Sequence, residues 1–328
     1  MIGRRGLATG FAIALAAPRL AAQPSVPVVC YLALATRQSD ARSVAAFRDG
    51  MRELGHVEGR SYLLVEAYAN GDMVRAEALL REQLARQPVS VFLTPGAAAV
   101  RLILRNTQSV PIVSAGLHPR GGQTDLFASL ARPGGMVTGV SNFGEELAAK
   151  RVQLLREVLP KLATVGVLHN TTDPVFRQWG EETEAEIRAQ GLTAVRLGLS
   201  SPAPEAMQRT LRDARGRGVE AVVIVRDFLT SSLHVAIARS SRDIGLASIA
   251  EERRYPEAGA LMSYGSSDRD LFRSTASYVD RILKGARPAD LPVQQPTRFE
   301  LVVNAGTARL LGIPLPKSML LRADEVIG

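Results

Sequence analysis

Val26-Pro27-Val28-Val29-Cys30-Tyr31-Leu32-Ala33 is the stretch that decides the fold of this chain. Its run of β-branched and other apolar residues predicts a β-strand. Residues 39–54 then place Val44, Phe47 and Met51 on one helix face, so an amphipathic helix is expected there. A strand followed at once by an amphipathic helix is the repeating unit of parallel α/β sheets.

This strand–helix alternation continues along the chain. The first set goes on with strands 62–69, 89–93, 111–114 and 137–140 and helices 73–87 and 97–106. A second set of alternating elements follows, with helices 145–159, 175–190, 204–215 and 233–244 and strands 164–168, 193–197, 221–225 and 246–249. Two successive sets predict an α/β fold with two doubly wound, parallel-sheet lobes. Binding sites are expected at the carboxyl ends of the strands.

The last third of the chain is too short to form a third lobe. It contains an expected strand 259–264, a helix 268–284, a proline-containing linker 288–296, a strand 298–303 and a short helix 305–311. These segments must add to the two existing sheets, so the chain crosses three times between the lobes and forms a hinge. We expect residues 26–139 with about 262–290 in the first lobe, and 140–261 with about 291–328 in the second.

The N-terminus predicts export. Arg4-Arg5 precedes a charge-free, mostly apolar run from 6 to 17, and small residues end at Ala22 before Gln23. This pattern is typical of a cleaved secretory signal over residues 1–22. A buried helix or a membrane anchor is the competing interpretation, but Arg19 interrupts the run and a span needs about 20 apolar residues. The arginine pair leaves general and twin-arginine export open, and both predict a periplasmic protein.

Composition and charge argue against a nucleic-acid partner. The 328 residues are 46% apolar and 22% charged, as in ordinary soluble proteins. The net charge is +8, and removal of the three arginines of the signal leaves about +5. The remaining arginines are scattered, so we expect no nucleic-acid partner.

The mature chain is expected to be monomeric and not embedded in a membrane. Cys30 is the single cysteine, which rules out an internal disulfide, and it lacks the small flanking residues of a lipid-anchor site.

Enzyme signatures are mostly absent from the sequence. No dinucleotide fingerprint, phosphate-binding loop, zinc-protease motif or hydrolase elbow is found. The histidines show no metal-ligand spacing, and we expect no metal, no cofactor and no catalytic residue. His118 and His169 follow expected strands, so an exported α/β hydrolase or transferase that uses one of them stays open as the alternative.

Three segments at strand ends suit ligand binding. Thr94-Pro95-Gly96 ends a strand and opens a helix, whose free amides favour an anion such as a carboxylate. The loop 34–39 offers Ala35, Thr36 and Ser39. In the second lobe, Asp227 could accept from an ammonium group and Phe228 could stack on a ligand. Plain helix caps or a solvated loop explain each segment about equally well. Further ligand-binding candidates at strand ends are Ser114, Asn170 and Tyr264.

Longer motifs carry a family resemblance. They are 257–265 (EAGALMSYG), 278–286 (YVDRILKGA), 288–293 (PADLPV) and 322–327 (RADEVI), with 47–55 (FRDGMRELG), 131–135 (ARPGG) and 138–141 (TGVS) earlier in the chain. Together they resemble the substrate-binding proteins of ABC transporters, in particular the tryptophan/tyrosine type. The resemblance covers essentially the whole mature chain.

The resemblance implies the type I periplasmic-binding-protein fold and a defined function. Such proteins close on a small solute, often an amino acid or another small organic acid, and deliver it to a membrane permease. Residues 35–39, 94–96, Asp227 and the segment around Tyr264 would line the cleft. This chain departs from the family pattern at 116–120, at Met136 and at 250–255, so the ligand stays open. A receptor rather than a permease is an alternative partner, whereas a LacI-like repressor would need a DNA-binding head in place of the signal.

Overall fold

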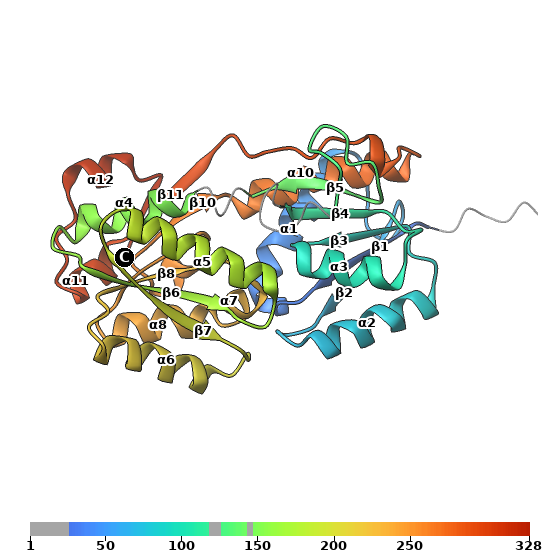
Figure 1. The fold of residues 1–328 in the computed structure, drawn as a ribbon. Helices are drawn as coiled ribbons and strands as arrows, with labels where there is room; N and C mark the ends of the chain where they lie inside the picture. The colour runs from blue at the N-terminus through green and yellow to red at the C-terminus, as the bar shows by residue number, and fades with distance from the viewer. Residues whose placement is uncertain (1–25, 118–125, 143–146) are drawn as a thin grey trace, which may run out of the picture.

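The computed structural model describes residues 26–117, 126–142 and 147–328, which form two α/β lobes (Figure 1). The sheet of the first lobe has the strand order β2-β1-β3-β4-β5 and is parallel throughout. Its strands are β1 (Val28–Ala33), β2 (Leu63–Tyr68), β3 (Val91–Thr94), β4 (Ile112–Leu117) and β5 (Val137–Ser141). Its helices are α1 (Arg37–Glu53), α2 (Met73–Arg86), α3 (Ala97–Asn106) and α10 (Asp268–Leu283).

The sheet of the second lobe has the order β12-β11-β10-β9-β8-β6-β7, and only the β10–β11 pair is antiparallel among its described pairings. Its strands are β6 (Thr164–Asn170), β7 (Thr193–Leu199), β8 (Ala221–Ile224), β9 (Ala247–Ala250), β10 (Met262–Ser266), β11 (Phe299–Asn304) and β12 (Glu325–Ile327). Its helices are α4 (Ala148–Val158), α5 (Pro174–Ala189), α6 (Pro204–Gly216), α7 (Phe228–Ser232), α8 (His234–Asp243), α9 (Arg254–Ala258), α11 (Ala305–Leu310) and α12 (Lys317–Arg322).

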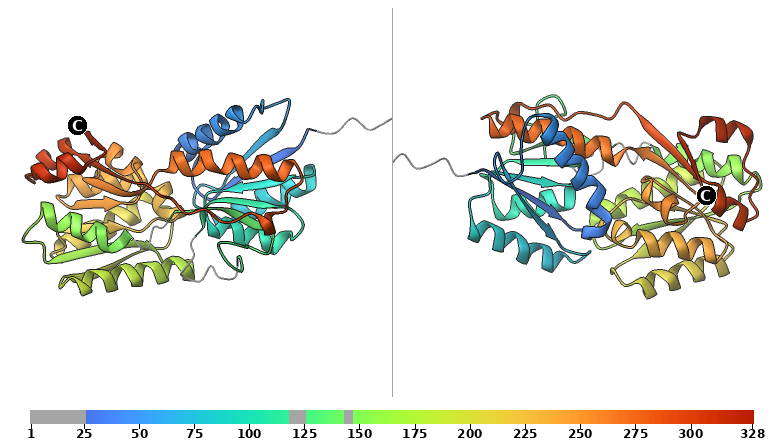
Figure 2. Two further views of the ribbon diagram at one scale, coloured as in Figure 1. Left: turned by 90° about the horizontal axis from the view of Figure 1, so that it is seen from above. Right: turned by 180° about the vertical axis from the view of Figure 1, so that it is seen from behind.

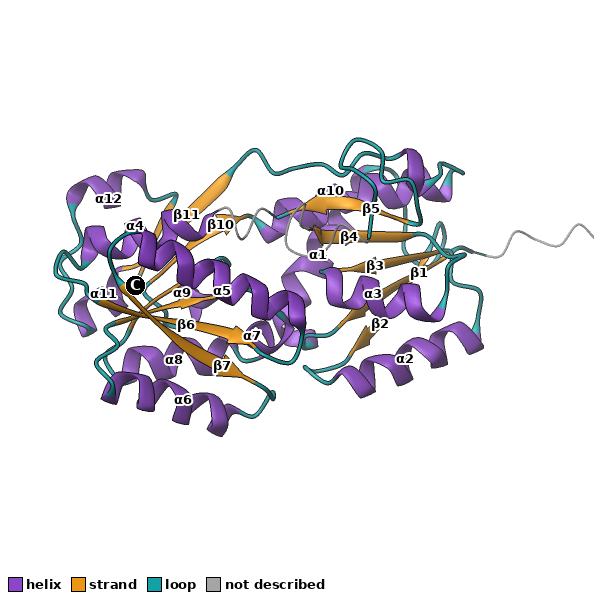
Figure 3. Cartoon of the chain, viewed as in Figure 1, coloured by secondary structure: helices purple, strands orange, loops and turns teal. Residues whose placement is uncertain are grey.

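The two sheets repeat one topology, which confirms the predicted pair of doubly wound lobes. The order β7-β6-β8-β9-β10 in the second sheet matches β2-β1-β3-β4-β5 in the first. In each sheet the order reverses beside the first strand of its set, β1 or β6. The loops that leave the sheet there diverge and open a crevice, which is the usual ligand position in such folds. Helices cover both faces of each sheet (Figure 3).

Side-chain alternation along β1 explains why both faces need helices. Val29 and Tyr31 belong to the core beneath α1 and α10, whereas Cys30 and Leu32 belong to the core beneath α2 and α3. All four are at most 1% exposed, because successive strand residues point to opposite faces and helices cover both. Cys30 therefore packs as a small apolar residue, as expected from its neighbours.

The chain passes between the lobes at three places, two of which differ in position from the expected boundaries. The first crossing follows β5 at Asn142. β10 was expected in the first lobe, but it pairs with β9 and β11 of the second sheet, so the second crossing falls near Ser267. α10 then packs on α1, and the backbone of Ser141 bonds to Gln294. The third crossing therefore lies after Gln294 rather than near 291. Figure 2 shows α10 lying along the first lobe.

Close packing of α10 on α1 depends on one glycine. A Cβ at Gly50 would lie 2.6 Å from the carbonyl oxygen of Arg273 and 2.8 Å from Cβ of Ala276. Both distances are shorter than van der Waals contact, so any side chain at this position must push the two helices apart. The glycine of the motif 47–55 thus has a packing role between segments more than 200 residues apart in the sequence.

The variant Gly50→Ala is predicted to lower the free energy of unfolding by about 1–3 kcal/mol, because it overpacks the α1–α10 contact. Gly216→Ala is the matched control: that glycine is also helical, and a Cβ there meets nothing within 4 Å. The control should leave stability unchanged or raise it by up to about 1 kcal/mol. Urea unfolding followed by circular dichroism measures both, and equal effects of the two variants would contradict the packing role.

Candidate functional site

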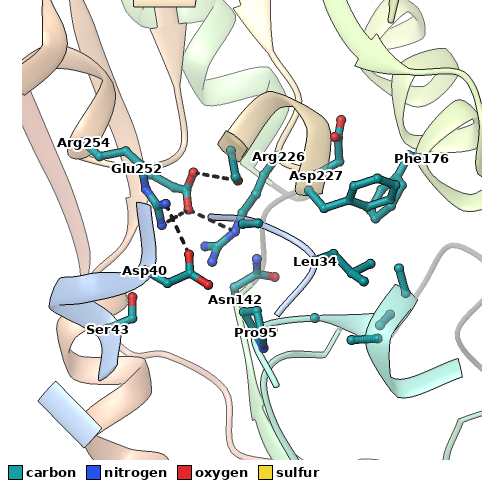
Figure 4. A pocket seen from close by; sticks show the side chains of 18 of the residues that line it. Leu34, Asp40, Ser43, Pro95, Asn142, Phe176, Arg226, Asp227, Glu252 and Arg254 are labelled. Carbon is teal, nitrogen blue, oxygen red and sulfur yellow. Dashed lines mark hydrogen bonds and ion pairs between the residues drawn. The ribbon is translucent and has the colours of Figure 1, made fainter. Parts of the chain in front are cut away.

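A cavity lies between the lobes, where the strand ends of the two sheets face each other (Figure 4). The first lobe contributes the segments that follow β1, β3 and β5, the end of β4, and residues of α1 and α10. The second lobe contributes the segments that follow β8 and β9 and the first turns of α5. The lining residues are Leu34, Ala35, Asp40, Ser43, Pro95, Gly96, Ala97, Ala98, Ala99, Gly116, Asn142, Phe176, Trp179, Arg226, Asp227, Phe228, Ser231, Glu252, Arg254 and Phe272.

The N-terminus of α3 opens into this cavity. Gly96 is its N-cap and offers no side chain to the first amides of the helix. Ala97, Ala98 and Ala99 form the first turn and line the cavity. The unpaired amides and the helix dipole together favour an anion at this position. Gly116 allows the close approach of the preceding loop, since a Cβ there would lie 2.4 Å from the carbonyl oxygen of Pro95.

Asn142 adds a buried acceptor to the same cavity. Its side chain is 2% exposed, and its Oδ1 has no hydrogen-bond partner among the described residues. A buried amide oxygen without a partner is costly, so a group that donates to it in the cavity would be stabilising. Figure 4 shows the Asn142 side chain directed towards the middle of the cavity.

Aromatic side chains form another part of the cavity wall. Phe176 contacts Trp179 and Phe228 edge to face, with ring centroids 5.2 Å and 5.8 Å apart. Leu34 faces them from the first lobe in Figure 4. Such a wall suits an apolar ligand body, because aromatic side chains offer a large apolar area.

Five charged residues form a second group, which we call the cleft charge cluster: Asp40, Arg226, Glu252, Arg254 and Asp268. Asp268 accepts from Nη1 of Arg226 at 2.8 Å and from Nη2 of Arg254 at 2.9 Å. Arg254 Nη2 also lies 2.7 Å from Glu252, and Nε of Arg226 lies 3.4 Å from the same carboxylate. Each of these side chains is at most 17% exposed. Buried charges of this kind persist only when they are paired.

Burial and pairing move the carboxyl pKa values of the cluster in different directions. Burial raises the pKa of Glu252 to about 7. Burial also acts to raise the pKa of Asp268, but the nearby guanidinium groups of Arg226 and Arg254 outweigh it and lower that pKa to about 2. Burial raises the pKa of Asp40, whose carboxylate accepts from the Tyr31 hydroxyl at 2.7 Å. Asp268 is therefore the fixed negative charge between the two arginines.

Asp227 lines the cavity and also caps α7. Its Oδ1 accepts from the amides of Leu229 and Thr230, and Oδ2 accepts from the amide of Asn170 at 3.1 Å. A carboxylate offers about four acceptor positions, of which three are thus occupied. Burial raises the pKa of Asp227 to about 7 despite these donors. The helix-cap interpretation of Asp227 is correct, and its contact with an ammonium group stays a prediction.

The other expected site residues divide into three groups. Ala35, Pro95 and Gly96 line the cavity. Thr36 and Ser39 instead form the capping box of α1. The remaining residues are not among those that line the cavity: Thr94 and Ser114 are buried, Asn170 accepts from Thr172 through its side chain, and Tyr264 packs on Phe299.

Of the two histidines of the enzyme alternative, His169 belongs to the described residues, and it is not among those that line the cavity. His169 is fully buried on β6, where Nδ1 lies 3.3 Å from the carbonyl oxygen of Val167, and a Cβ at Gly180 would lie 2.6 Å from its ring. Burial lowers its pKa, so the ring is neutral at pH 7. His118 lies outside the described residues.

Sequence patterns missed much of the polar lining. Asp40 and Ser43 belong to α1, where they were treated as part of an ordinary amphipathic helix. Glu252 and Arg254 fall in 250–255, the segment already noted as departing from the family pattern. A role of Glu252 and Arg254 in the site could have been inferred, because residues 250–255 directly follow a predicted strand and sites lie at strand ends.

Side-chain contacts also join the two lobes beside the cavity. Arg254, in the second lobe, donates from Nη1 to the carbonyl oxygen of Ser39 at 2.9 Å and lies 3.7 Å from Asp40 in the first lobe. Arg42 of α1 pairs with Glu257 of α9. Arg254 thus belongs both to the cavity wall and to the contact between the lobes.

Comparison with known proteins agrees with this architecture. A family model described as ABC transporter substrate binding protein matches residues 31–327. A tyrosine-binding protein of Clostridioides difficile (strain R20291) is 20% identical over 267 residues, which are 81% of this chain and 75% of that protein. Among the described residues no helix is long and apolar enough to cross a membrane.

Solved structures show the same fold. An ABC domain in complex with L-Trp from Streptococcus pneumonia superposes with a TM-score of 0.82 at 24% identity, over 92% of this chain and 100% of that one. A conserved domain protein from Vibrio cholerae gives a TM-score of 0.83 at 22% identity, over 92% and 99%. The predicted type I periplasmic-binding-protein fold is therefore confirmed.

A pH-dependent loss of stability is predicted from Asp227. The folded state holds this proton up to about pH 7, whereas the unfolded chain releases it near the ordinary value of 3.8. The free energy of unfolding should therefore fall as the pH rises from about 4 through 7. In Asp227→Asn, the free energy of unfolding should depend less steeply on pH. The pH dependence that remains in this variant should come from Glu252, whose pKa is also raised to about 7.

Asp227→Ala is the companion variant in this experiment. It removes the titrating group and the cap, so it should cost about 1 kcal/mol more than Asp227→Asn at every pH. Chemical denaturation between pH 5 and pH 8 gives both quantities. A wild-type slope that persists unchanged in both variants would show that Asp227 does not titrate in this range.

Proposed function

The chain belongs to the ABC transporter substrate-binding protein family, and we propose that it captures a small organic carboxylate with an apolar body, such as an amino acid, and delivers it to an ABC permease. One observation carries the proposal: the cavity between the lobes has an open helix N-terminus, a buried acceptor and an aromatic wall. The names of two relatives, a tyrosine-binding protein and an L-Trp complex, support an amino acid.

In this proposal, the ligand carboxylate binds at the first turn of α3. The amides of Ala97, Ala98 and Ala99 supply donors there, and the helix dipole adds to the attraction. An ammonium group of the ligand would donate to Oδ1 of Asn142, which has no partner among the described residues. The apolar body would lie against Phe176 and Phe228, with burial of about 150 Å² of apolar surface stabilising the complex by about 4 kcal/mol.

Binding rather than catalysis is the role that the site supports. Members of this family bind solutes, and the described cavity lining contains acids and arginines whose charges are largely satisfied by one another. A solute held between two lobes is released when they separate, which suits capture and handover.

Export to the periplasm is part of the proposal. It is supported by the signal-like pattern of residues 1–22 and by the family, whose members serve membrane transporters. We propose that the mature chain begins near Gln23 and acts as a monomer.

Ala97→Pro is predicted to weaken binding of the amino-acid ligand about 10-fold to 100-fold, because it deletes one amide that would donate to the carboxylate. Proline is tolerated at the first helical position, and the extended backbone of Gly96 (φ −173°, ψ 173°) accepts a following proline. Met73→Pro, at the first position of α2, is the matched control and should leave affinity unchanged.

The measurement is a thermal-shift screen of amino acids and small carboxylates, followed by calorimetry on the compounds that stabilise the protein. Stabilisation by none of them would overturn the proposed ligand class. Equal affinity of wild type and Ala97→Pro would instead show that the ligand carboxylate does not bind at the N-terminus of α3, and it would leave the proposed ligand class unchanged.

Arg254→Gln is predicted to shift the ligand-free protein towards separated lobes, because it removes the contacts with Ser39 and Asp40. Small-angle X-ray scattering should show a larger radius of gyration. Arg253→Gln is the control, since Arg253 pairs with Glu257 and Glu325 within the second lobe. An unchanged scattering curve for Arg254→Gln would show that this contact does not stabilise the closed arrangement.

A further inference from the structure

Arg226 is a cavity residue whose charge the proposed binding mode does not use. It follows β8 in the second lobe, lines the cavity and keeps its side chain 14% exposed. Figure 4 shows its guanidinium group in the middle of the cavity, between Asp40 and Asn142. A charged group in this position meets whatever solute the lobes enclose.

The guanidinium group of Arg226 is held in place from behind. Nη1 donates to Asp268 at 2.8 Å, and Nε lies 3.4 Å from Glu252. Asp268 is itself fixed by Arg254 at 2.9 Å. The remaining terminal nitrogen, Nη2, donates no hydrogen bond to a described residue. A guanidinium that is fixed on two atoms and open on the third is a preorganised donor, which binds an acceptor without a further ordering cost.

The cavity therefore has two groups of donors for acceptor atoms, one on each lobe. The amides at the start of α3 belong to the first lobe, and Arg226 belongs to the second. A ligand whose only acceptor group is one carboxylate pairs with the α3 amides alone. Arg226 would then lack an acceptor when the lobes enclose the ligand, which is unfavourable for a buried donor.

We propose that Arg226 is a specificity-determining residue that binds a second acceptor group of the ligand, so that the solute is bifunctional: a carboxylate at α3, an apolar body and a further carboxylate, carbonyl or hydroxyl oxygen at Arg226. This inference rests on the proposed function and narrows its ligand class. Sites built to hydrogen-bond one substrate group discriminate strongly against analogues that lack it. A charge-assisted bond of this kind predicts a preference of at least about 10-fold.

The experiment compares ligand pairs that differ in one acceptor. The pairs are L-tyrosine with L-phenylalanine, L-glutamate with L-norvaline, and terephthalate with benzoate, measured by calorimetry on wild type, Arg226→Met and Arg226→Lys. Arg226→Lys keeps a positive charge beside Asp268, so this variant is expected to fold even if Arg226→Met does not. Thermal unfolding checks that both variants are folded. The expected result is a preference of at least 10-fold for the acceptor-bearing member in one or more pairs, reduced to about 1 in Arg226→Met.

Three other results overturn the inference, each in a different way. Equal weakening of both members of every pair by Arg226→Met would assign Arg226 to the shared carboxylate. Unchanged affinities would make Arg226 a structural partner of Asp268. Absence of binding by all six compounds would reject the proposed function together with the inference. Binding of terephthalate through Arg226 without any amino acid binding would keep the inference and reject the amino-acid ligand.

Discussion

The packing of α10 on α1 is the constraint on which the architecture depends. α10 lies in the first lobe, yet β10 before it and β11 after it pair with each other in the second sheet. The chain must therefore leave the second lobe and return to it, which ties the two lobes at neighbouring points. Gly50 makes the contact possible, because its missing side chain leaves room for the backbone at Arg273. The cavity exists because two tied lobes place their strand ends opposite each other.

Much of this fold could be predicted from the sequence, because local patterns determine it. The alternation of buried strands with amphipathic helices gave both lobes, and α3 begins and ends where its spacing predicts. The short helices α7, α9 and α12 were not expected, since five or six residues carry too little periodicity. β10 was assigned to the wrong lobe, because sequence order alone does not reveal which sheet edge a late strand joins.

The site was less predictable than the fold, for a physical reason. Thr94-Pro95-Gly96 has a local signal, a strand end that opens a helix, and Pro95 and Gly96 do line the cavity. The ion pairs of Arg226 and Arg254 join residues from three separate elements, and in the sequence they look like ordinary solvated charges. Their burial is a property of the assembled lobes. Arg254 and Glu252 lie in 250–255, where the sequence differs from the pattern expected for the family, so this segment is a natural place for ligand preference to be set.

The late position of α10 has a consequence for the order in which the molecule can form. Until residues 268–283 have been synthesised, Phe272 and Ala276 are missing from the core beneath α1, and one face of the first sheet has no second helix over it. The first lobe, although it begins at the N-terminus, thus cannot complete its core before the second lobe has almost entirely emerged. Such a chain keeps its amino-terminal half incompletely folded for most of its synthesis.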